Sequence, residues 1–246
     1  MKRVLFLIIG ITLICAGFAV ATGKTHWGYS GHAGPEHWGE LSEEYAVCGS
    51  GKNQSPIDLS GMIKADLETI KFDYKDTPLE VVNNGHTVKV SYAEGSSIEI
   101  DGTPFKLLQF HFHTPSENLI DGKSFPMEAH LVHSDNNGNL AVVSVMFSEG
   151  QENEVAGTVK KYMSPQMDKV VSEPDISVNV MNMLPGNKDY YRFNGSLTTP
   201  PCTEGVRWLV MKAPVEVSKE QIEKFHEIMH DNNRPVQSRY ARPVLK

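Results

Sequence analysis

Short runs of β-branched and aromatic residues, separated by turn signals, follow one another along most of this chain and limit the folds that it can adopt. Such runs are typical of β-strands, whose side chains alternate between two faces. Asn84-Gly85 and Asn137-Gly138 each lie between two of the runs. Because Asn-Gly adopts positive φ at little cost, both dipeptides predict hairpins that join antiparallel neighbours. The runs are LEVV (79–82), HTVKVSY (86–92), SIEI (97–100), FKLLQFHFH (105–113), MEAHLVH (127–133), LAVVSVMF (140–147) and VRWLVMK (206–212).

Helical signals are fewer than strand signals. Residues 152–163 have a helical pattern, and Ser218 followed by Gln221 is typical of a capped helix start. Residues 25–58 are rich in Gly, His, Trp and Pro with little periodicity, which predicts an irregular segment laid over a core. We therefore expect a mixed α+β fold dominated by β-structure, with one large, mostly antiparallel sheet and a few peripheral helices.

The charge balance narrows the range of partners. The chain has 246 residues, a length that fits one large domain or at most two small ones. Its 23 basic residues are outnumbered by 30 acidic ones, so the formal net charge is −7, and no window gathers enough Lys or Arg to follow a phosphate backbone. We therefore expect no nucleic-acid partner, and no membrane contact apart from the start of the chain.

The start of the chain has the pattern of a secretory signal. Lys2 and Arg3 precede an apolar run over 4–20, and Ala19-Val20-Ala21 supplies the small residues of a cleavage site. Residues 1–21 are therefore predicted to be a signal peptide, residues 22–246 a single domain, and the protein to be exported, either periplasmic or secreted. The apolar run is slightly long for a signal, so an uncleaved membrane anchor remains an open alternative.

Removal of residues 1–21 leaves two cysteines, Cys48 and Cys202. Two cysteines in an exported chain have one possible pairing, which would close a loop of roughly 150 residues. Two buried free thiols are the alternative.

A strictly alternating segment contains the first candidate metal ligands. Gln109, His111 and His113 alternate with two phenylalanines, so on a strand these three side chains share one face, with about 7 Å between the Cα atoms of the two histidines. Glu128 and His130 repeat the spacing on the next predicted strand. If the two strands pair, a third imidazole reaches the same point. Three histidines with an open fourth position are typical of catalytic zinc.

Gln109 and Glu128 each precede a histidine by two residues on the same face. Metal-bound histidines usually donate their second N–H to a carboxylate, amide or carbonyl, so these two side chains are candidates for that outer role. An isolated His-x-His on a strand is more often a pair of half-buried histidines with ordinary hydrogen bonds. The third histidine and the two polar companions favour the metal site here.

A second histidine motif competes with this interpretation. His226, Glu227 and His230 match HExxH, the helical zinc motif of metallopeptidases. On a helix that begins at Ser218, however, both histidines fall opposite the apolar stripe and face solvent. The chain also offers no later Glu or His as a third ligand. We therefore disfavour a peptidase.

Further motifs along the chain make it similar to a known family. In the family's own order, the sequence contains WGYSG and GPEHW near Trp27 and Trp38, QSPIDL (54–59), VVNNGH (81–86), QFHFH (109–113), SEN with Glu117, MEAHLVH (127–133), GSLTTPPC (195–202) and NNRPVQ (232–237). These motifs resemble those of the α-class carbonic anhydrases over essentially the whole of the predicted mature chain.

This resemblance implies a fold, a cofactor and a reaction. The fold would be a twisted sheet of about ten strands, mostly antiparallel. Zn²⁺ would be held by His111, His113 and His130. The reaction would be reversible hydration of carbon dioxide to bicarbonate and a proton, through zinc-bound hydroxide. Thr198 would accept a hydrogen bond from that hydroxide and donate its own proton to Glu117.

The remaining expectations for the site also come from the resemblance. His86 would carry protons between the metal site and solvent, a task that suits an imidazole with an unperturbed pKa near 6.5. The apolar wall that receives carbon dioxide would be formed by Val132, Val142, Leu197 and Trp208, with Thr199 beside it, and the water chain for protons would be held by Tyr29, Asn84 and Thr199.

Exported members of the family have a disulfide, which here would join Cys48 and Cys202, and they have cis peptide bonds before the prolines that match Pro56 and Pro201. Sulfonamides and small anions would inhibit, activated esters would be side substrates, and a homodimer remains open. The alternative from another class is a catalytically silent binding protein on the same fold, in which a zinc histidine is usually lost. All three histidines are present in this chain.

Overall fold

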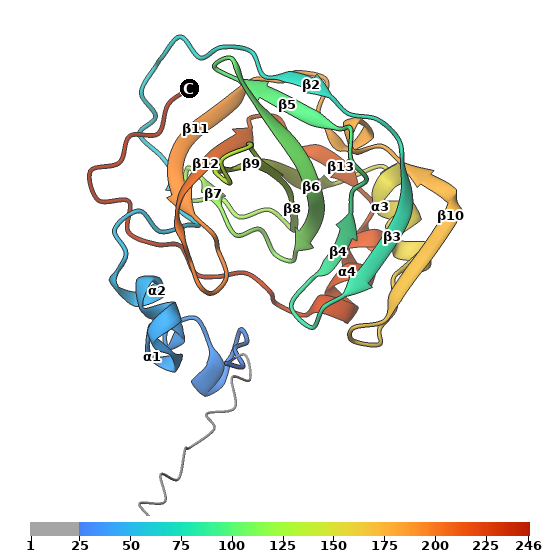
Figure 1. Cartoon of the computed structure of the whole chain (residues 1–246), viewed down its shortest axis with the longest axis horizontal. Helices are drawn as coiled ribbons and strands as arrows, with labels where there is room; N and C mark the ends of the chain where they lie inside the picture. Colours follow the sequence, from blue (N-terminus) through green and yellow to red (C-terminus); the bar gives the residue numbers. More distant parts are fainter. Residues whose placement is uncertain (1–24) are drawn as a thin grey trace, which may run out of the picture.

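A strongly curved sheet forms the body of the protein (Figure 1). The computed structural model describes residues 25–246, so the predicted signal peptide and the predicted mature start at Thr22 lie outside the described residues. Within residues 25–246 the sheet has 11 strands. They are β2 (Lys71–Asp73), β3 (Thr77–Asn83), β4 (Val88–Ser91), β5 (Ser97–Ile100), β6 (Thr103–His113), β8 (Met127–Ser134), β9 (Leu140–Glu149), β10 (Val170–Val178), β11 (Tyr190–Ser196), β12 (Glu204–Met211) and β13 (Val215–Val217).

The strand order confirms the predicted topology. The main path runs β10-β3-β4-β6-β8-β9-β12-β11, while β5 joins β6 to β2 and β13 pairs with β9. All pairs are antiparallel except those of β9 with β12 and with β13. Both predicted Asn-Gly hairpins are present, between β3 and β4 and between β8 and β9. A separate parallel pair is formed by β1 (Asp58–Leu59) and β7 (Leu119–Ile120).

The helices lie at the periphery, as predicted. The N-terminal region holds α1 (Trp38–Leu41) and α2 (Ala46–Ser50), while α3 (Glu154–Tyr162) and α4 (Lys219–Met229) pack on one face of the sheet. Ser218 and Gln221 form the predicted capping box of α4. None of the helices within residues 25–246 has the length and apolar content needed to cross a bilayer. The 3₁₀ helices are η1 (Gly31–Ala33), η2 (Glu43–Tyr45) and η3 (Val180–Met183).

Four strands of the large sheet, β2, β10, β11 and β13, lie outside the runs predicted from the sequence, and the two longest of these show why. β10 includes Glu173, Pro174 and Asp175, and its pairing with β3 is interrupted by a register shift between Glu173 and Ser177. A bulge removes the regular alternation on which strand prediction depends. β11 mixes polar and aromatic residues without a period of two. The segment 25–58, predicted to be irregular, contains several short helical turns.

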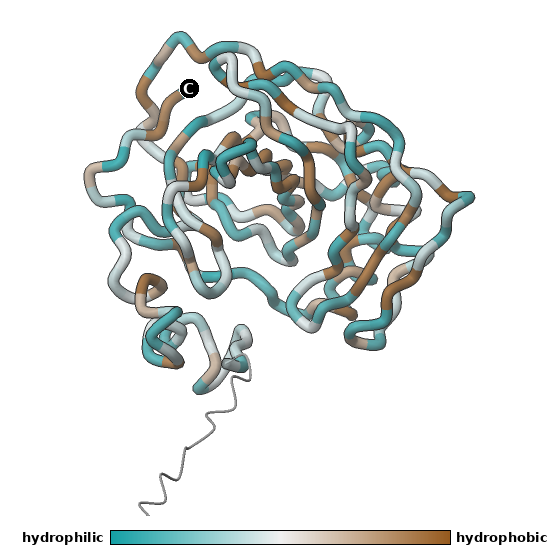
Figure 2. Tube along the Cα trace, viewed as in Figure 1, coloured by the Kyte–Doolittle hydropathy of each residue, from teal (hydrophilic) through white to brown (hydrophobic). Residues whose placement is uncertain are grey.

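The two faces of the sheet carry different kinds of side chain. On β8, Ala129 and Leu131 belong to the larger apolar core, whereas Glu128 and His130 point to the opposite face. A second, smaller apolar cluster that includes Trp208 lies on this opposite face. Figure 2 shows hydrophobic residues gathered along the strands in the middle of the molecule, while the outer loops are mostly hydrophilic. Candidate functional groups therefore stand on one face, and the other face packs the core.

One buried polar pair lies within the larger core. His133 Nδ1 faces the carbonyl oxygen of Ala141 at 3.3 Å, and His133 Nε2 lies 2.9 Å from the Tyr74 hydroxyl. A carbonyl can only accept, so Nδ1 carries the hydrogen and Nε2 accepts from Tyr74. Burial lowers the pKa of His133 to about 3, although its hydrogen bonds to backbone carbonyls oppose this shift.

The depressed pKa of His133 predicts acid sensitivity. Between the unfolded pKa near 6.5 and the folded pKa of about 3, the unfolded chain binds a proton that the folded chain does not, so stability falls as pH falls through this window. Urea unfolding of His133→Gln should therefore show a smaller loss of unfolding free energy between pH 7 and pH 4 than wild type. Exposed His226→Gln is the control, and equal losses in both variants would contradict the prediction.

Candidate metal centre

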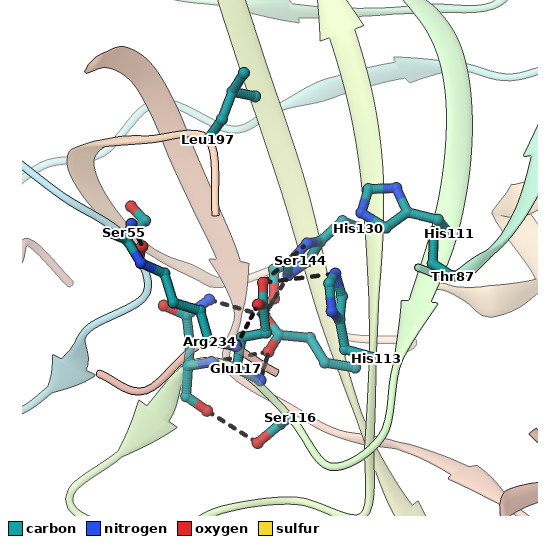
Figure 3. A network of polar contacts seen from close by, with 12 residues as sticks. Ser55, Thr87, His111, His113, Ser116, Glu117, His130, Ser144, Leu197 and Arg234 are labelled. Carbon is teal, nitrogen blue, oxygen red and sulfur yellow. Dashed lines mark hydrogen bonds and ion pairs between the residues drawn. The ribbon is translucent and has the colours of Figure 1, made fainter. Parts of the chain in front are cut away.

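Three histidines from two neighbouring strands meet on the face opposite the large core. His111 and His113 come from β6, and His130 of β8 is the direct cross-strand partner of His111. One ring nitrogen from each lies within 4.8 Å of the other two. Figure 3 shows the three rings turned toward one another, with Glu117 beside His113. The predicted convergence is confirmed, and it depends on the β6–β8 register.

Each histidine hydrogen-bonds an outer partner through its other ring nitrogen. His111 Nδ1 lies 2.9 Å from Gln109 Oε1, and His130 Nε2 lies 2.8 Å from Glu128 Oε1. These oxygens accept, so each histidine donates through that nitrogen, and the opposite nitrogen is free to bind a metal. These are the two contacts expected from the sequence.

The outer partner of His113 is a residue to which the sequence assigned no role. His113 Nδ1 lies 2.7 Å from the backbone carbonyl of Asn232. The Asn232 side chain accepts from the Thr114 N–H and donates to the carbonyl of His86. The motif NNRPVQ marked this segment, but a backbone carbonyl is common to every residue type and gives no local signal.

The donor set fits zinc. His113 Nε2 is buried and has no hydrogen-bonding partner among residues 25–246, which is unusual for a buried polar atom unless a ligand completes it. Burial holds the pKa of His111 well below its usual range, with smaller contributions from His113, His130 and Lys89. Neutral imidazole is the form that binds metal, and three such ligands match catalytic zinc.

Two buried carboxyl groups next to the histidines have pKa values that are shifted in opposite directions. Burial alone would raise the pKa of Glu128, but His130, Ser144 and Asn118 stabilise the charged form and lower that pKa to about 2. Burial raises the pKa of Glu117 to about 7, although His130, the Arg234 N–H and the Thr198 hydroxyl all favour its charged form. The backbone N–H of Glu117 donates to Glu128 Oε2 at 2.7 Å, so the two acids belong to one network.

Thr198 and Thr199 lie in the loop between β11 and β12. The Cys202 N–H donates to the Thr199 carbonyl at 2.8 Å, and Cys202 forms a disulfide with Cys48. The pairing expected from the resemblance is therefore present, and the alternative of two free thiols is excluded. The expected cis bonds before Pro56 and Pro201 are also present, with a third before Pro115.

The residues expected to form an apolar wall lie together. Val142 and Trp208 belong to the smaller apolar cluster, with Val132 and Leu197 packed against it. The Trp208 ring centroid is 4.9 Å from that of His130. The structure therefore places an apolar surface directly beside one of the three histidines.

A cavity of about 160 Å³ opens beside the metal centre. It is lined by His111, His113 and Thr199 together with the residues expected on the proton path, Tyr29, Asn84 and His86. The Tyr29 hydroxyl is buried without a hydrogen-bonding partner in the described part of the chain. Asn84 Oδ1 accepts from the N–H groups of His86 and Thr87, so this oxygen helps to shape the turn.

His86 stacks on Trp27, with ring centroids 3.6 Å apart and planes within 7°. Burial lowers the pKa of His86, and His26 lowers it further, against a smaller opposing effect of Asp168. His86 therefore stands at the edge of the cavity as a histidine that releases its proton easily.

Arg234 is a second residue to which the sequence assigned no role. Its guanidinium group is almost fully buried and donates to the carbonyls of Cys48 and Ser55 and to the Gln54 side chain. Its backbone N–H donates to Glu117 Oε1 at 2.9 Å. Arg234 thus connects the disulfide region to the buried acid of the site.

The HExxH motif does not form a second metal site. His226 and His230 are exposed, and α4 ends at Met229, so His230 lies outside the helix. His226 Nδ1 lies 3.7 Å from Asp231 Oδ1. Within residues 25–246 the one group of three or more potential ligands close enough to share an ion is the set His111, His113 and His130.

Fold and site together define a β-sheet protein with a three-histidine metal centre of the catalytic type. A family model for eukaryotic-type carbonic anhydrase matches residues 33–246. The chain therefore belongs to this family, the α-class carbonic anhydrases.

Individual relatives agree with this assignment. A carbonic anhydrase of Klebsiella pneumoniae is 46% identical over 233 residues, covering 92% of this chain and 93% of the relative. A carbonic anhydrase of Neisseria gonorrhoeae is 44% identical, covering 96% and 94%. The solved α-carbonic anhydrase of Thermovibrio ammonificans, in complex with the inhibitor sulfanilamide, is 50% identical with a TM-score of 0.88, covering 91% of this chain and 100% of that one.

Proposed function

We propose that this protein catalyses the reversible hydration of carbon dioxide to bicarbonate and a proton. The observation that carries the proposal is the set of three buried or half-buried imidazoles, each with one nitrogen hydrogen-bonded outward and the other directed to a common point. His111, His113 and His130 would hold the zinc ion. When bound, zinc makes water acidic enough to react at neutral pH, and carbonic anhydrase is the reference case for this effect.

Thr198 and Glu117 orient the reacting water. Charged Glu117 can only accept hydrogen bonds, and we propose that the neighbouring Thr198 hydroxyl, which favours the charged form of Glu117, donates to it. The lone pairs of Thr198 Oγ1 are then free to accept a hydrogen bond from the reacting water. This hydrogen bond fixes the direction in which a lone pair of the water points. The hydrogen bonds from the Arg234 N–H and within the Glu128 network keep Glu117 in place.

The apolar wall receives the neutral substrate. The side chains of Val132, Val142 and Leu197 carry no hydrogen-bonding group, and the indole N–H of Trp208 already donates to the Ser196 carbonyl. Carbon dioxide is thereby held next to the metal centre without displacing a hydrogen-bonded water from this wall. Such a surface raises the effective concentration of carbon dioxide at the metal centre and aligns it with the reacting water.

Each turnover leaves one proton to be removed, and we propose His86 as the group that carries it. In dilute buffer, His86→Ala should lower the hydration turnover number by about tenfold or more, because bulk water is a poor proton acceptor. Added imidazole should restore the rate. Stopped-flow measurements at several buffer concentrations test this, with exposed His32→Ala as the control. An unchanged rate of His86→Ala in dilute buffer would contradict the shuttle role.

The decisive test of the function combines metal content with catalysis. Protein that begins at Thr22 should contain one zinc ion per chain and should hydrate carbon dioxide in a stopped-flow assay. Removal of zinc with a chelator should abolish the activity, and its return should restore it. A fully zinc-loaded protein without hydration activity would overturn the proposal and favour the catalytically silent alternative. Sulfonamides should inhibit, as sulfanilamide does for the relative of known structure.

We also propose that the protein is exported, to the periplasm or beyond the cell, after removal of residues 1–21. The disulfide supports this, because such bridges persist in oxidising compartments. Mass spectrometry of protein purified from its native host should show an N-terminus at or close to Thr22. An intact N-terminus would instead support the anchor alternative.

A further inference from the structure

One fixed positive charge lines the cavity beside the metal centre. The cavity is lined by ten described residues, and Lys89 is the single lysine among them, with no Arg, Asp or Glu. The electrostatic character of the cavity wall is therefore set largely by Lys89.

The strand pattern places Lys89 on this face. Val88 and Val90 belong to the large apolar core, so the residue between them points to the opposite face of β4. Lys89 is the cross-strand partner of His111 on β6. Residues paired in this way share a face, with Cβ atoms about 5 Å apart. The side chain of Lys89 thus starts beside a proposed metal ligand.

No acidic group neutralises this charge nearby. In the described part of the chain, no carboxylate oxygen lies within 4.0 Å of the Lys89 ammonium group. The two acids of the site, Glu117 and Glu128, are fully buried and engaged with His130, Arg234, Asn118 and Ser144. An unpaired cation in the cavity of a chain whose net charge is −7 favours negatively charged ligands there.

We propose that Lys89 is a specificity-determining residue that strengthens the binding of small monovalent anions, bicarbonate among them, in this cavity. This inference rests on the proposed function, in which bicarbonate is one of the two reacting species. The same charge opposes the binding of a divalent cation by the three histidines. The charge of Lys89 therefore strengthens the binding of the anion and weakens the binding of the metal ion, whereas it does not attract neutral carbon dioxide.

These opposite signs separate an electrostatic role from a structural one. If Lys89 merely supports the fold, its replacement should weaken the binding of both ligands or of neither. Loss of its charge should instead weaken the binding of the anion and strengthen the binding of zinc. Because the charge is partly exposed to solvent, both effects should shrink as salt is added.

The experiment compares wild type with Lys89→Gln, Lys89→Arg and Lys106→Gln. Lys106 lies on the same strand as His111, is exposed and does not line the cavity, so its replacement changes the net charge equally. Thiocyanate serves as the anionic probe, measured by calorimetry on the zinc-loaded proteins. Zinc affinity of the metal-free proteins is measured by competition with a chelator. Neither readout depends on catalysis.

At low ionic strength, Lys89→Gln should bind thiocyanate about three- to tenfold more weakly and zinc about tenfold more tightly than wild type. Lys89→Arg should retain wild-type values for both ligands, and Lys106→Gln should resemble wild type. The inference is overturned if Lys89→Gln matches wild type, if both ligands weaken together, or if Lys106→Gln gives the same shifts. A zinc-loaded wild type that fails to hydrate carbon dioxide overturns the proposed function instead, and leaves these two binding measurements intact.

Discussion

The His111→Ala variant is expected to bind zinc roughly a hundred- to a thousandfold more weakly than wild type and to lose at least a comparable factor in hydration rate. A four-ligand zinc site is worth about 10–16 kcal/mol, so one ligand corresponds to roughly 2.5–4 kcal/mol. The β6–β8 register places His111 directly opposite His130, and among residues 25–246 the one group of three or more potential ligands close enough to share an ion includes His111. Chelator competition and stopped-flow hydration measure the two quantities.

Two further variants locate the cause of any loss. His226→Ala changes an exposed histidine of the HExxH motif and should leave zinc content and rate unchanged. Thr198→Val should retain zinc but slow hydration by about a hundredfold, because an orienting hydrogen bond is lost while the ligands remain. Full activity of His111→Ala at wild-type zinc content would refute the metal centre described here.

The Cys48→Ser/Cys202→Ser double variant is expected to lose about 4–5 kcal/mol of unfolding free energy. The bridge joins residues 154 positions apart, so in the unfolded chain it restricts a very long loop. The carbonyls of Cys48 and Cys202 accept hydrogen bonds from Arg234 and Gln54, and serine can keep both contacts. The folded variant should therefore retain most of its activity.

Urea unfolding of the oxidised wild type and of the double variant measures this difference. The single variant Cys48→Ser is the matched control, because it breaks the same bridge while leaving Cys202 as a free thiol. A loss below about 1 kcal/mol would show that the unfolded chain gains little freedom when the bridge is removed, contrary to the loop-entropy estimate.

Much of the fold and part of the site could be predicted from local pattern. Alternation on β6 separates His111 and His113 from the two phenylalanines, and the structure places the histidines and phenylalanines on opposite faces. The helical pattern after Ser218 turns His226 away from the core, as observed. The bulged strand β10 could not be predicted, because its pairing interrupts the period of two.

The sequence alone determined which residue types stand on each face of a strand or helix, because that choice depends on the spacing of neighbours along the chain. Only the tertiary structure decided that His130 pairs with His111, that the Asn232 carbonyl faces His113, and that the Arg234 backbone N–H reaches Glu117. The physical reason is that these contacts join segments distant in the chain, and two of them use backbone atoms that every non-proline residue shares.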